Sequence, residues 1–509
     1  MRSAIIITLA LVAVAAAANV HKAKRHGEIN PLLVQQILTK RPIAPPASGK
    51  SNPSGRLVVE NFFTTRVDHF NAQNTDEWTL QYYSAPDNYR EGGPILIFLS
   101  GNLPIRTDMV DDSSLMYELG RELHGAVYAF ESRFFGQSWV TNDVSTENLH
   151  LLNSDQILAD LAEFVQYLKG AVLRNEHAHV LVAGSGYGGA LATWFRVRYP
   201  HLADAAWSSS GFHHAVPNFQ QFAEAWGQTL IDFGGQRCYN DIFVAFHVIE
   251  NLLDMGLADV VSERFNLCTP IDVEDSLQVQ YFLAGLMSTV ELFTLVNGNV
   301  SDFAVVCDEI TNSQASSTLD ALAQWFTSKV SMGEECINLD IDLTIDALRE
   351  VEWNATLNQY GIRQTLYQEC TEFGWFPTTT DSDHQPFGNR ISLDLYTETC
   401  RRVFGDWITH DSLEYSTQRA NNRFGGKLPA IQQAHFTFGA EDPTRPISIT
   451  HDLNPMALAD AIPGAIHASD LRATSDSDSE ELRATKEHMK LLVSKYLFPV
   501  SPRVSVEDA

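Results

Sequence analysis

A serine stands in a glycine-rich turn near the middle of the chain, where one element is expected to end and another to begin. The stretch from His179 to Pro200 reads HVLVAGSGYGGALATWFRVRYP. Its first residues are apolar and rich in β-branched side chains, which predicts a buried strand, and its last residues have helical spacing. A serine hydroxyl at such a turn can attack an acyl carbon when a histidine removes its proton. Ser185 and its neighbours are therefore candidate nucleophile positions.

The spacing of the glycines decides which residue forms the tip of this turn. Strand, glycine-rich turn and helix are the context of the G-x-S-x-G nucleophile elbow of α/β-hydrolases. The central residue of an elbow is strained at positive φ, and the residues two places away must be small because they approach its backbone. Gly184 and Gly188 flank position 186 in this way, so the tip is Gly186, which has no side chain. Centring the turn on Ser185 would place the bulky Tyr187 at a flank.

The residues around this turn resemble a family of serine peptidases that includes lysosomal Pro-X carboxypeptidase, dipeptidyl peptidase II and thymus-specific serine protease. The elbow of that family reads G-G-S-Y-G-G and is followed by L-A-x-W-x-R-x-x-Y-P. The matching residues stand in the same register without a gap: Tyr187, Gly188, Gly189, Leu191, Ala192, Trp194, Arg196, Tyr199 and Pro200. This register also places the nucleophilic serine of the family on Gly186.

Two later segments resemble the loops that carry the other catalytic groups of this family. The sequence GAEDP follows a predicted strand over 434–438 and is similar to the family's G-x-x-D-P-W turn, which puts Asp442 on the triad aspartate, with Thr444 in place of the Trp. The sequence AIPGAIHASDL is similar to G-x-x-H-C-x-D-L, which puts His467 on the triad histidine, with Ala468 in place of the Cys. The order nucleophile, Asp, His is that of α/β-hydrolases.

A buried parallel strand is predicted over 94–100, because nearly all of its residues are apolar. In α/β-hydrolases the loop after this strand donates one oxyanion-hole amide, and the residue after the nucleophile donates the other. These positions are Gly101 and Asn102, where the family usually has G-G-E, and Tyr187.

Three further segments resemble the family. They are DHFN at 68–71, ESRFFGQS at 131–138 and YQECTEFGWFP at 367–377, the last of which returns from a helical cap towards the active site. The aromatic residues Phe373, Trp375 and Phe376 are candidates for lining a pocket that takes a proline-like side chain. Ordinary core packing is the alternative for each of them taken singly.

The missing side chain at Gly186 removes the group that serine peptidase chemistry needs most. Asp442 and His467 would form a general base with no nucleophile to serve, and loss of the catalytic serine costs on the order of 10⁶ in turnover. Ser185 is the alternative nucleophile, but its Cα lies ~3.8 Å from the tip, and successive side chains near a strand end point in different directions.

Three functions therefore stay open. The first is a peptide-binding homologue that lacks the usual activity, the second is an active serine peptidase that uses Ser185 or a rearranged elbow, and the third is a structural or carrier glycoprotein. The resemblance implies short peptides as partners, proline-containing ones included, and we expect no cofactor or metal. The sequence leaves a homodimer open.

Alternating strands and helices predict a doubly wound α/β-hydrolase sheet that an inserted helical cap interrupts. The predicted core occupies 57–214 and 361–500, the cap occupies 215–360, and 501–509 is a tail. This division follows from the helical periodicity of the inserted segment, which has few strand signals. At 509 residues, of which 44% are hydrophobic, the chain is long enough to bury a large core.

All six cysteines fall between Cys238 and Cys400, and none has the close spacing of a zinc site. An even number in a secreted chain favours disulfides, but the sequence does not choose among the many pairings, and free buried cysteines are the alternative. The resemblance implies the pairs Cys238–Cys307, Cys268–Cys336 and Cys370–Cys400. Asn299 and Asn354 begin glycosylation sequons, which often go unused.

The amino terminus reads as a secretory signal. Residues 1–18 combine Arg2, an apolar stretch and a small-residue cleavage site, and a membrane anchor is the alternative reading. Residues 19–56 are rich in proline and read as a flexible leader, and no later stretch has the length of a membrane span. The net charge of −28 argues against nucleic acid or an anionic membrane as a partner. We therefore expect a secreted or lysosomal protein.

Overall fold

The computed structural model describes residues 58–295, 300–331 and 335–499. The predicted signal (1–18), leader (19–56) and tail (501–509) lie outside the described residues, as does Asn299. Asn354 is exposed just before a short helix, and its glycosylation stays a prediction. None of the helices in the described ranges combines the length and the apolar composition that crossing a bilayer requires.

One eight-stranded sheet forms the centre of the structure, in the order β1-β2-β4-β3-β5-β6-β9-β10. The six strands from β4 to β10 in this order are parallel, while β1 and β2 form an antiparallel pair, with β2 antiparallel to β4. The strands are β1 (Val59–Arg66), β2 (Glu77–Ala85), β3 (Ile95–Leu99), β4 (Ala126–Phe130), β5 (Val180–Ser185), β6 (Ala205–Ser209), β9 (Ala434–Gly439) and β10 (Ala457–Ile462).

The parallel part of this sheet confirms the predicted fold class. The antiparallel edge and β10 were not predicted. β10 was missed because its sequence, ALADAI, is short, half-exposed and interrupted by Asp460, so it shows no strand periodicity.

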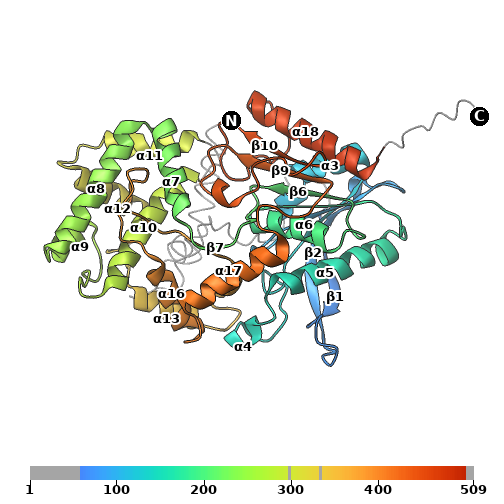
Figure 1. Cartoon of the computed structure of the whole chain (residues 1–509), viewed down its shortest axis with the longest axis horizontal. Coiled ribbons are helices and arrows are strands. Elements are labelled where there is room, and N and C mark those ends of the chain that lie inside the picture. The colour runs from blue at the N-terminus through green and yellow to red at the C-terminus, as the bar shows by residue number, and fades with distance from the viewer. Residues whose placement is uncertain (1–57, 296–299, 332–334, 500–509) are drawn as a thin grey trace, which may run out of the picture.

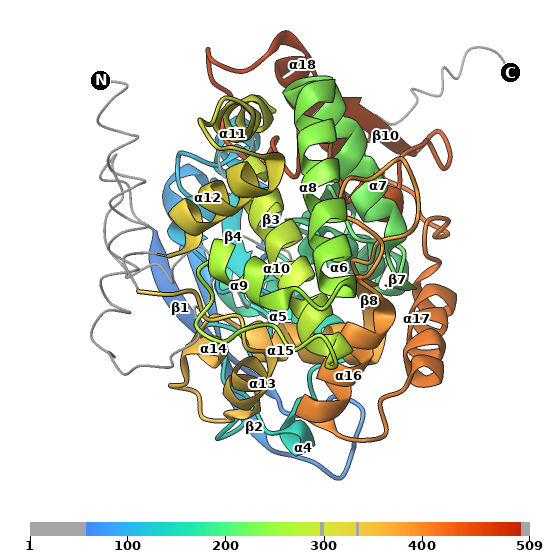
Figure 2. The same ribbon diagram turned by 90° about the vertical axis from the view of Figure 1, so that its left-hand side faces the viewer.

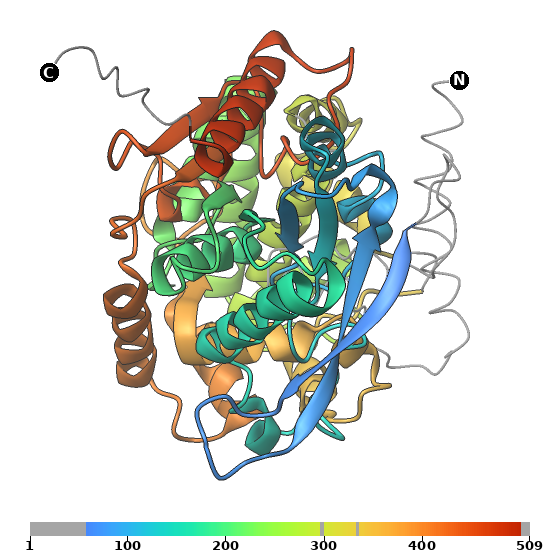
Figure 3. The ribbon, with the colours of Figure 1, turned by 90° about the vertical axis from the view of Figure 1, so that its right-hand side faces the viewer.

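Helices cover both faces of the sheet. Successive strand residues point to opposite faces, so Ile95 and Ile97 of β3 belong to one hydrophobic cluster and Leu96 and Phe98 to another. The first cluster continues into α5 and α6, and the second into α3 and α18 (Figures 1 and 3). The bounds of the helices in this part of the chain are α3 (Leu115–Leu123), α4 (Thr146–Leu149), α5 (Ser154–Tyr167), α6 (Tyr187–Arg198), α17 (His410–Phe424) and α18 (Glu480–Leu497).

A group of helices gathers beside the sheet, at the left of Figure 1 and facing the viewer in Figure 2. They are α7 (Gln220–Thr229), α8 (Gln236–Asp254), α9 (Ala258–Arg264), α10 (Ser276–Leu295), α11 (Ser301–Thr311), α12 (Thr318–Val330), α13 (Ile341–Arg349), α14 (Thr356–Gln359), α15 (Ile362–Gln368) and α16 (Leu393–Phe404). β7 (Val216–Asn218), just before α7, pairs in parallel with β8 (Gly374–Phe376), which lies between α15 and α16 in the chain. The boundaries of a separate cap domain stay a prediction, since one hydrophobic cluster runs through both parts.

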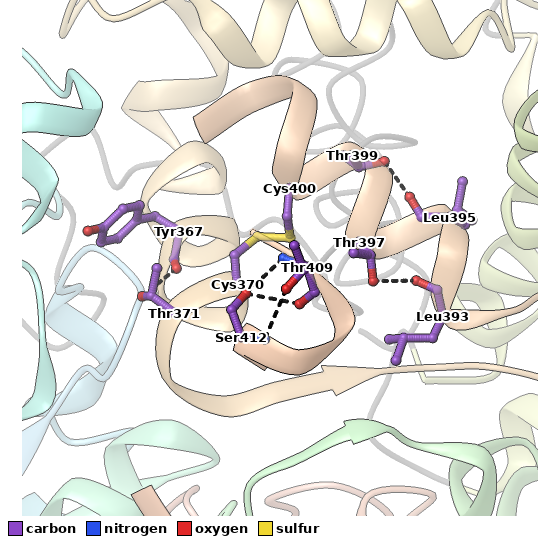
Figure 4. Close-up of a disulfide and its surroundings, with 10 residues drawn as sticks. All are labelled: Tyr367, Cys370, Thr371, Leu393, Leu395, Thr397, Thr399, Cys400, Thr409 and Ser412. Atoms are coloured by element: carbon purple, nitrogen blue, oxygen red, sulfur yellow. Dashed lines mark hydrogen bonds between the residues drawn. A yellow bond between two sulfur atoms is a disulfide. The ribbon is translucent and has the colours of Figure 1, made fainter. Parts of the chain in front are cut away.

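Three disulfides link Cys238 to Cys307, Cys268 to Cys336 and Cys370 to Cys400, with Cα–Cα distances of 5.3, 5.0 and 5.9 Å. These are the pairs that the resemblance implied. Cys370 lies in the helical turn just before β8 and Cys400 lies in α16, so the third bond joins two consecutive segments of the chain (Figure 4). It thereby anchors the segment that carries Phe373 and Trp375.

Candidate active site

The turn between β5 and α6 has Gly186 at its tip. Gly186 adopts φ 53° and ψ −122°, a backbone conformation that favours glycine. Ser185 is still part of β5, where it pairs with Ser209 of β6. Within the described parts of the chain, no hydrogen bond joins Ser185 to His467. The structure therefore places Ser185 in the strand and Gly186 at the position from which a side chain would leave the turn.

The flanking glycines are required by close approach of the backbone. A Cβ on Gly184 would lie 2.4 Å from the carbonyl carbon and oxygen of Gly188, and a Cβ on Gly188 would lie 2.4 Å from the carbonyl oxygen of Leu99. Neither contact is possible without a backbone shift, because the opposing atoms are main-chain atoms. The spacing of these two glycines thus reflects the geometry of the turn, as the sequence predicted.

Position 186 itself has room for a side chain. A Cβ built there would lie 3.4 Å from two ring carbons of Phe212 and 3.5 Å from Nε2 of His467, which are ordinary van der Waals distances. The strand topology explains this convergence, because β5, β6 and β10 are parallel and their following loops meet at one edge of the sheet.

His467 and Asp442 form a hydrogen-bonded pair at this edge. Nδ1 of His467 lies 2.9 Å from Oδ2 of Asp442, and the amide and hydroxyl of Thr444 donate to Oδ1 at 2.8 and 2.7 Å. Burial acts to raise the pKa of Asp442, but the charge of His467 and the hydrogen bonds from His467 and Thr444 outweigh it and hold the pKa below its usual value. A carboxylate facing Nδ1 keeps the ring proton there, so Nε2 is left to face position 186.

Three backbone amides near the tip of the turn have no hydrogen-bond acceptor among the described residues. In the described residues, the amides of Tyr187, Gly101 and Asn102 donate to no protein acceptor. Gly101 lies directly against the turn, since a Cβ on it would come within 2.7 Å of the amide nitrogen of Gly188. Tyr187 is the first residue of α6, where backbone N–H groups have no helical acceptor. Their role as an oxyanion hole stays a prediction.

A row of aromatic rings leads to His467. The rings of Phe373 and Trp375 stack at 4.6 Å, Trp375 contacts Phe212 edge-on at 5.2 Å, and Phe212 lies 5.5 Å from the ring of His467. Sequence reasoning missed Phe212. The available signal was its place just after β6, because residues that follow neighbouring parallel strands lie at the same edge.

Phe376, the third predicted pocket residue, lies elsewhere. Its ring is fully buried and stacks on Tyr396 of α16 at 4.8 Å. Within the described residues this ring packs on Tyr396 and not on the row that leads to His467. The structure therefore brings together two of the three predicted aromatics and adds Phe212.

A model of the serine carboxypeptidase S28 family matches residues 65–489, which include the turn at Gly186 and the loops that carry Asp442 and His467. The chain belongs to the serine carboxypeptidase S28 family. Mouse thymus-specific serine protease is similar to this S28 chain, with 27% identity over 467 residues that cover 89% of the chain and 90% of the mouse protein. Bovine lysosomal Pro-X carboxypeptidase is 26% identical over 488 residues, which cover 88% and 91% of the two proteins.

Among solved structures, the peroxisomal alpha-beta-hydrolase Lpx1 of Saccharomyces cerevisiae aligns over 88% of this S28 chain and 93% of its own, with 11% identity and a TM-score of 0.37. The family match confirms the resemblance that the elbow and the two later motifs indicated.

A buried polar network holds the first residue of α6 in this S28 chain. The hydroxyl of Tyr187 lies 3.1 Å from Oγ of Ser154 and accepts from Nε2 of Gln368 at 3.0 Å. The amide of Ser154 donates to Oε2 of Glu372 at 3.0 Å. Burial raises the pKa of Glu372 to about 7, although the hydrogen bonds from Ser154 partly oppose it. The network fixes the Tyr187 side chain on the side of the turn away from solvent.

A hollow of about 350 Å³ lies along α7, next to the turn that carries Asp442. Gln221, Glu224, Gln228, His384 and Pro446 contribute to its lining. Among the described residues, this hollow is lined neither by the His467–Asp442 dyad nor by the residues with free amides near the turn. The rings of the aromatic row do not line it either. We therefore assign it no part in the candidate active site.

Proposed function

We propose that this S28 chain binds short peptides and lacks the usual serine peptidase activity, because Gly186 stands where the nucleophile would be. The observation that carries the proposal is the distance of 3.5 Å between a Cβ at position 186 and Nε2 of His467. A serine Oγ on that Cβ would come within hydrogen-bond reach of the imidazole, about 2.6–3.2 Å. With glycine at this position there is no oxygen to form the acyl-enzyme.

The remaining parts of the site support binding without turnover. In a serine peptidase, His467 would take the serine proton at Nε2, Asp442 would orient the ring, and the free amides would hold the oxyanion. The dyad is intact, with a hydrogen bond of 2.9 Å. The row of Phe373, Trp375 and Phe212 beside it is apolar, and an aromatic row of this kind is suited to pack against an apolar ring such as that of proline. A peptide can therefore be held at a site that does not cleave it.

The compartment is part of the same proposal. Relatives of this chain are named lysosomal Pro-X carboxypeptidases, and the amino-terminal residues read as a secretory signal. We propose that the protein is secreted or lysosomal and that peptides with proline near the carboxyl end are its ligands.

Two measurements test this function. Purified protein should release no fluorophore from a Pro-X peptide substrate above the background of a His467→Ala variant. Proline-containing peptides should raise the melting temperature, and Trp375→Leu should reduce that shift while Trp407→Leu, an exposed tryptophan away from the site, should not.

Cleavage of the substrate by the natural protein that a fluorophosphonate inhibits would contradict the proposed loss of activity. If no peptide changes the melting temperature, the proposed peptide binding is wrong and a structural or carrier role is favoured.

A further inference from the structure

Two histidines and an aspartate from three separate elements converge on one side of the sheet. His435 is the second residue of β9, Asp460 the fourth residue of β10, and His488 lies in the middle of α18. Their side-chain ligand atoms all lie within 4.8 Å of one another. Nε2 of His435 is 3.0 Å from Oδ2 of Asp460, and Nδ1 of His488 is 2.5 Å from the same oxygen.

This cluster is separate from the candidate active site. His435 lies near the amino end of β9, whereas Asp442 follows the carboxyl end of the same strand. Figure 1 shows α18 running beside β9 and β10, which are the elements that supply the three side chains. Among the described residues, none of the three side chains hydrogen-bonds to His467 or Asp442.

The donor set favours one class of ion. Two imidazole nitrogens and one carboxylate oxygen suit zinc, while calcium and magnesium prefer oxygen donors throughout. With zinc–ligand bonds of about 2.0–2.2 Å, neighbouring ligands in a tetrahedral site lie roughly 3.4 Å apart. The two contacts to Asp460 would need to open by less than about 1 Å to reach this spacing.

One ligand residue of the cluster is buried, and the other two are partly exposed to solvent. The side chain of His435 is fully buried, while 27% of the Asp460 side chain and 40% of the His488 side chain are exposed. Nδ1 of His435 has no hydrogen-bond partner among the described residues. The nitrogen that faces Asp460 is Nε2, so Nε2 is the ring atom that would hold an ion, and an ion can enter from the side of Asp460 and His488, with water as its fourth ligand.

We propose that His435, Asp460 and His488 bind one zinc ion, which fastens α18 to the β9–β10 edge of the sheet. The sequence predicted no metal site, because these residues are far apart in the chain and form no motif. Zinc binding requires both imidazoles to be neutral and the Asp460 carboxylate to be ionised.

The test uses full-length protein stripped with a chelator. Zinc is titrated in competition with a chromophoric chelator, and the melting temperature is followed in parallel. We compare the natural protein with His488→Gln, which alters a partly exposed ligand, and with His247→Gln, the same change at an exposed histidine of α8. Asp460→Asn is the second ligand variant, and cobalt replaces zinc for a spectroscopic readout of tetrahedral coordination.

We expect the natural protein and His247→Gln each to bind one zinc ion tightly per chain. Zinc should raise the melting temperature of both above that of the chelator-stripped proteins. Loss of even an outer-shell partner costs about 10- to 100-fold in affinity, so His488→Gln should bind at least about 100-fold more weakly. The cobalt spectrum should disappear in both ligand variants. Equal zinc binding by His488→Gln, or no tight equivalent in the natural protein, would mean that the three residues form only an ion-pair cluster and would overturn the proposal.

Discussion

Replacing Gly186 with serine tests whether the nucleophile is the only group that the site lacks. The structure leaves room for the new side chain, since its Cβ would meet Phe212 at 3.4 Å and His467 at 3.5 Å. The hydroxyl would face Nε2 of His467, whose other nitrogen is held by Asp442. Gly186→Ser should therefore fold and should carry a serine that the dyad can activate.

The cost of this change comes from the backbone. Gly186 has φ 53°, and a non-glycine residue held in such a conformation costs about 1–3 kcal/mol. Gly186→Ala carries the same backbone cost without a hydroxyl, so it is the matched control, and the two variants should melt at similar temperatures. Loss of a catalytic serine lowers turnover by roughly 10⁶-fold. If the amides and the dyad can still support catalysis, the serine variant regains part of that turnover.

The assay is labelling with a fluorophosphonate probe, which reacts with an activated serine. We expect label on Gly186→Ser and none on the natural protein or on Gly186→Ala. Adding Asp442→Asn to the serine variant should slow labelling by about 10⁴-fold, because the dyad then loses its orienting carboxylate. Label on the natural protein that maps to Ser185 would refute the assignment of position 186. No label on a folded Gly186→Ser protein would refute the competence of the remaining groups.

Three other changes follow from the same structure. Replacing Cys370 and Cys400 with serine opens a loop of sequence separation 30 and should lower the free energy of unfolding by about 3–4 kcal/mol. The denaturation midpoint in urea should fall accordingly, and an unchanged midpoint would contradict this. Gly184→Ala forces a Cβ to 2.4 Å from backbone atoms and should cost about 3 kcal/mol or more, so it should melt below Gly186→Ala. Glu372 has a pKa raised to about 7 from an ordinary 4.5, so the folded chain holds that proton more tightly than the unfolded chain. The stability that this proton contributes is present at acid pH and is lost as pH rises through 7, by up to about 3 kcal/mol. Glu372→Gln should flatten the fall in melting temperature between about pH 5 and pH 8, and an equal fall in both proteins would contradict the assignment.

The sequence determined the site where its constraints are local. Gly184 and Gly188 are spaced by the backbone contacts of one tight turn, and such contacts involve residues a few places apart, so the tip at Gly186 was predictable. The parallel strands were predictable for a similar reason, since β3 and β5 are continuous apolar runs that only a doubly covered sheet accommodates. The family register also indicated Asp442 and His467, which the structure joins in a hydrogen bond of 2.9 Å.

The tertiary structure decided what depends on contacts between distant segments. Phe376 lies in a segment that resembles the family and Phe212 does not, yet Phe212 is the one that lies beside His467, because β6 ends at the same edge of the sheet as β5. Strand β10 escaped prediction because its pairing with β9, and not its own composition, makes it a strand. His435, Asp460 and His488 show no pattern in the sequence, since only the packing of α18 on these two strands brings their side chains within 4.8 Å.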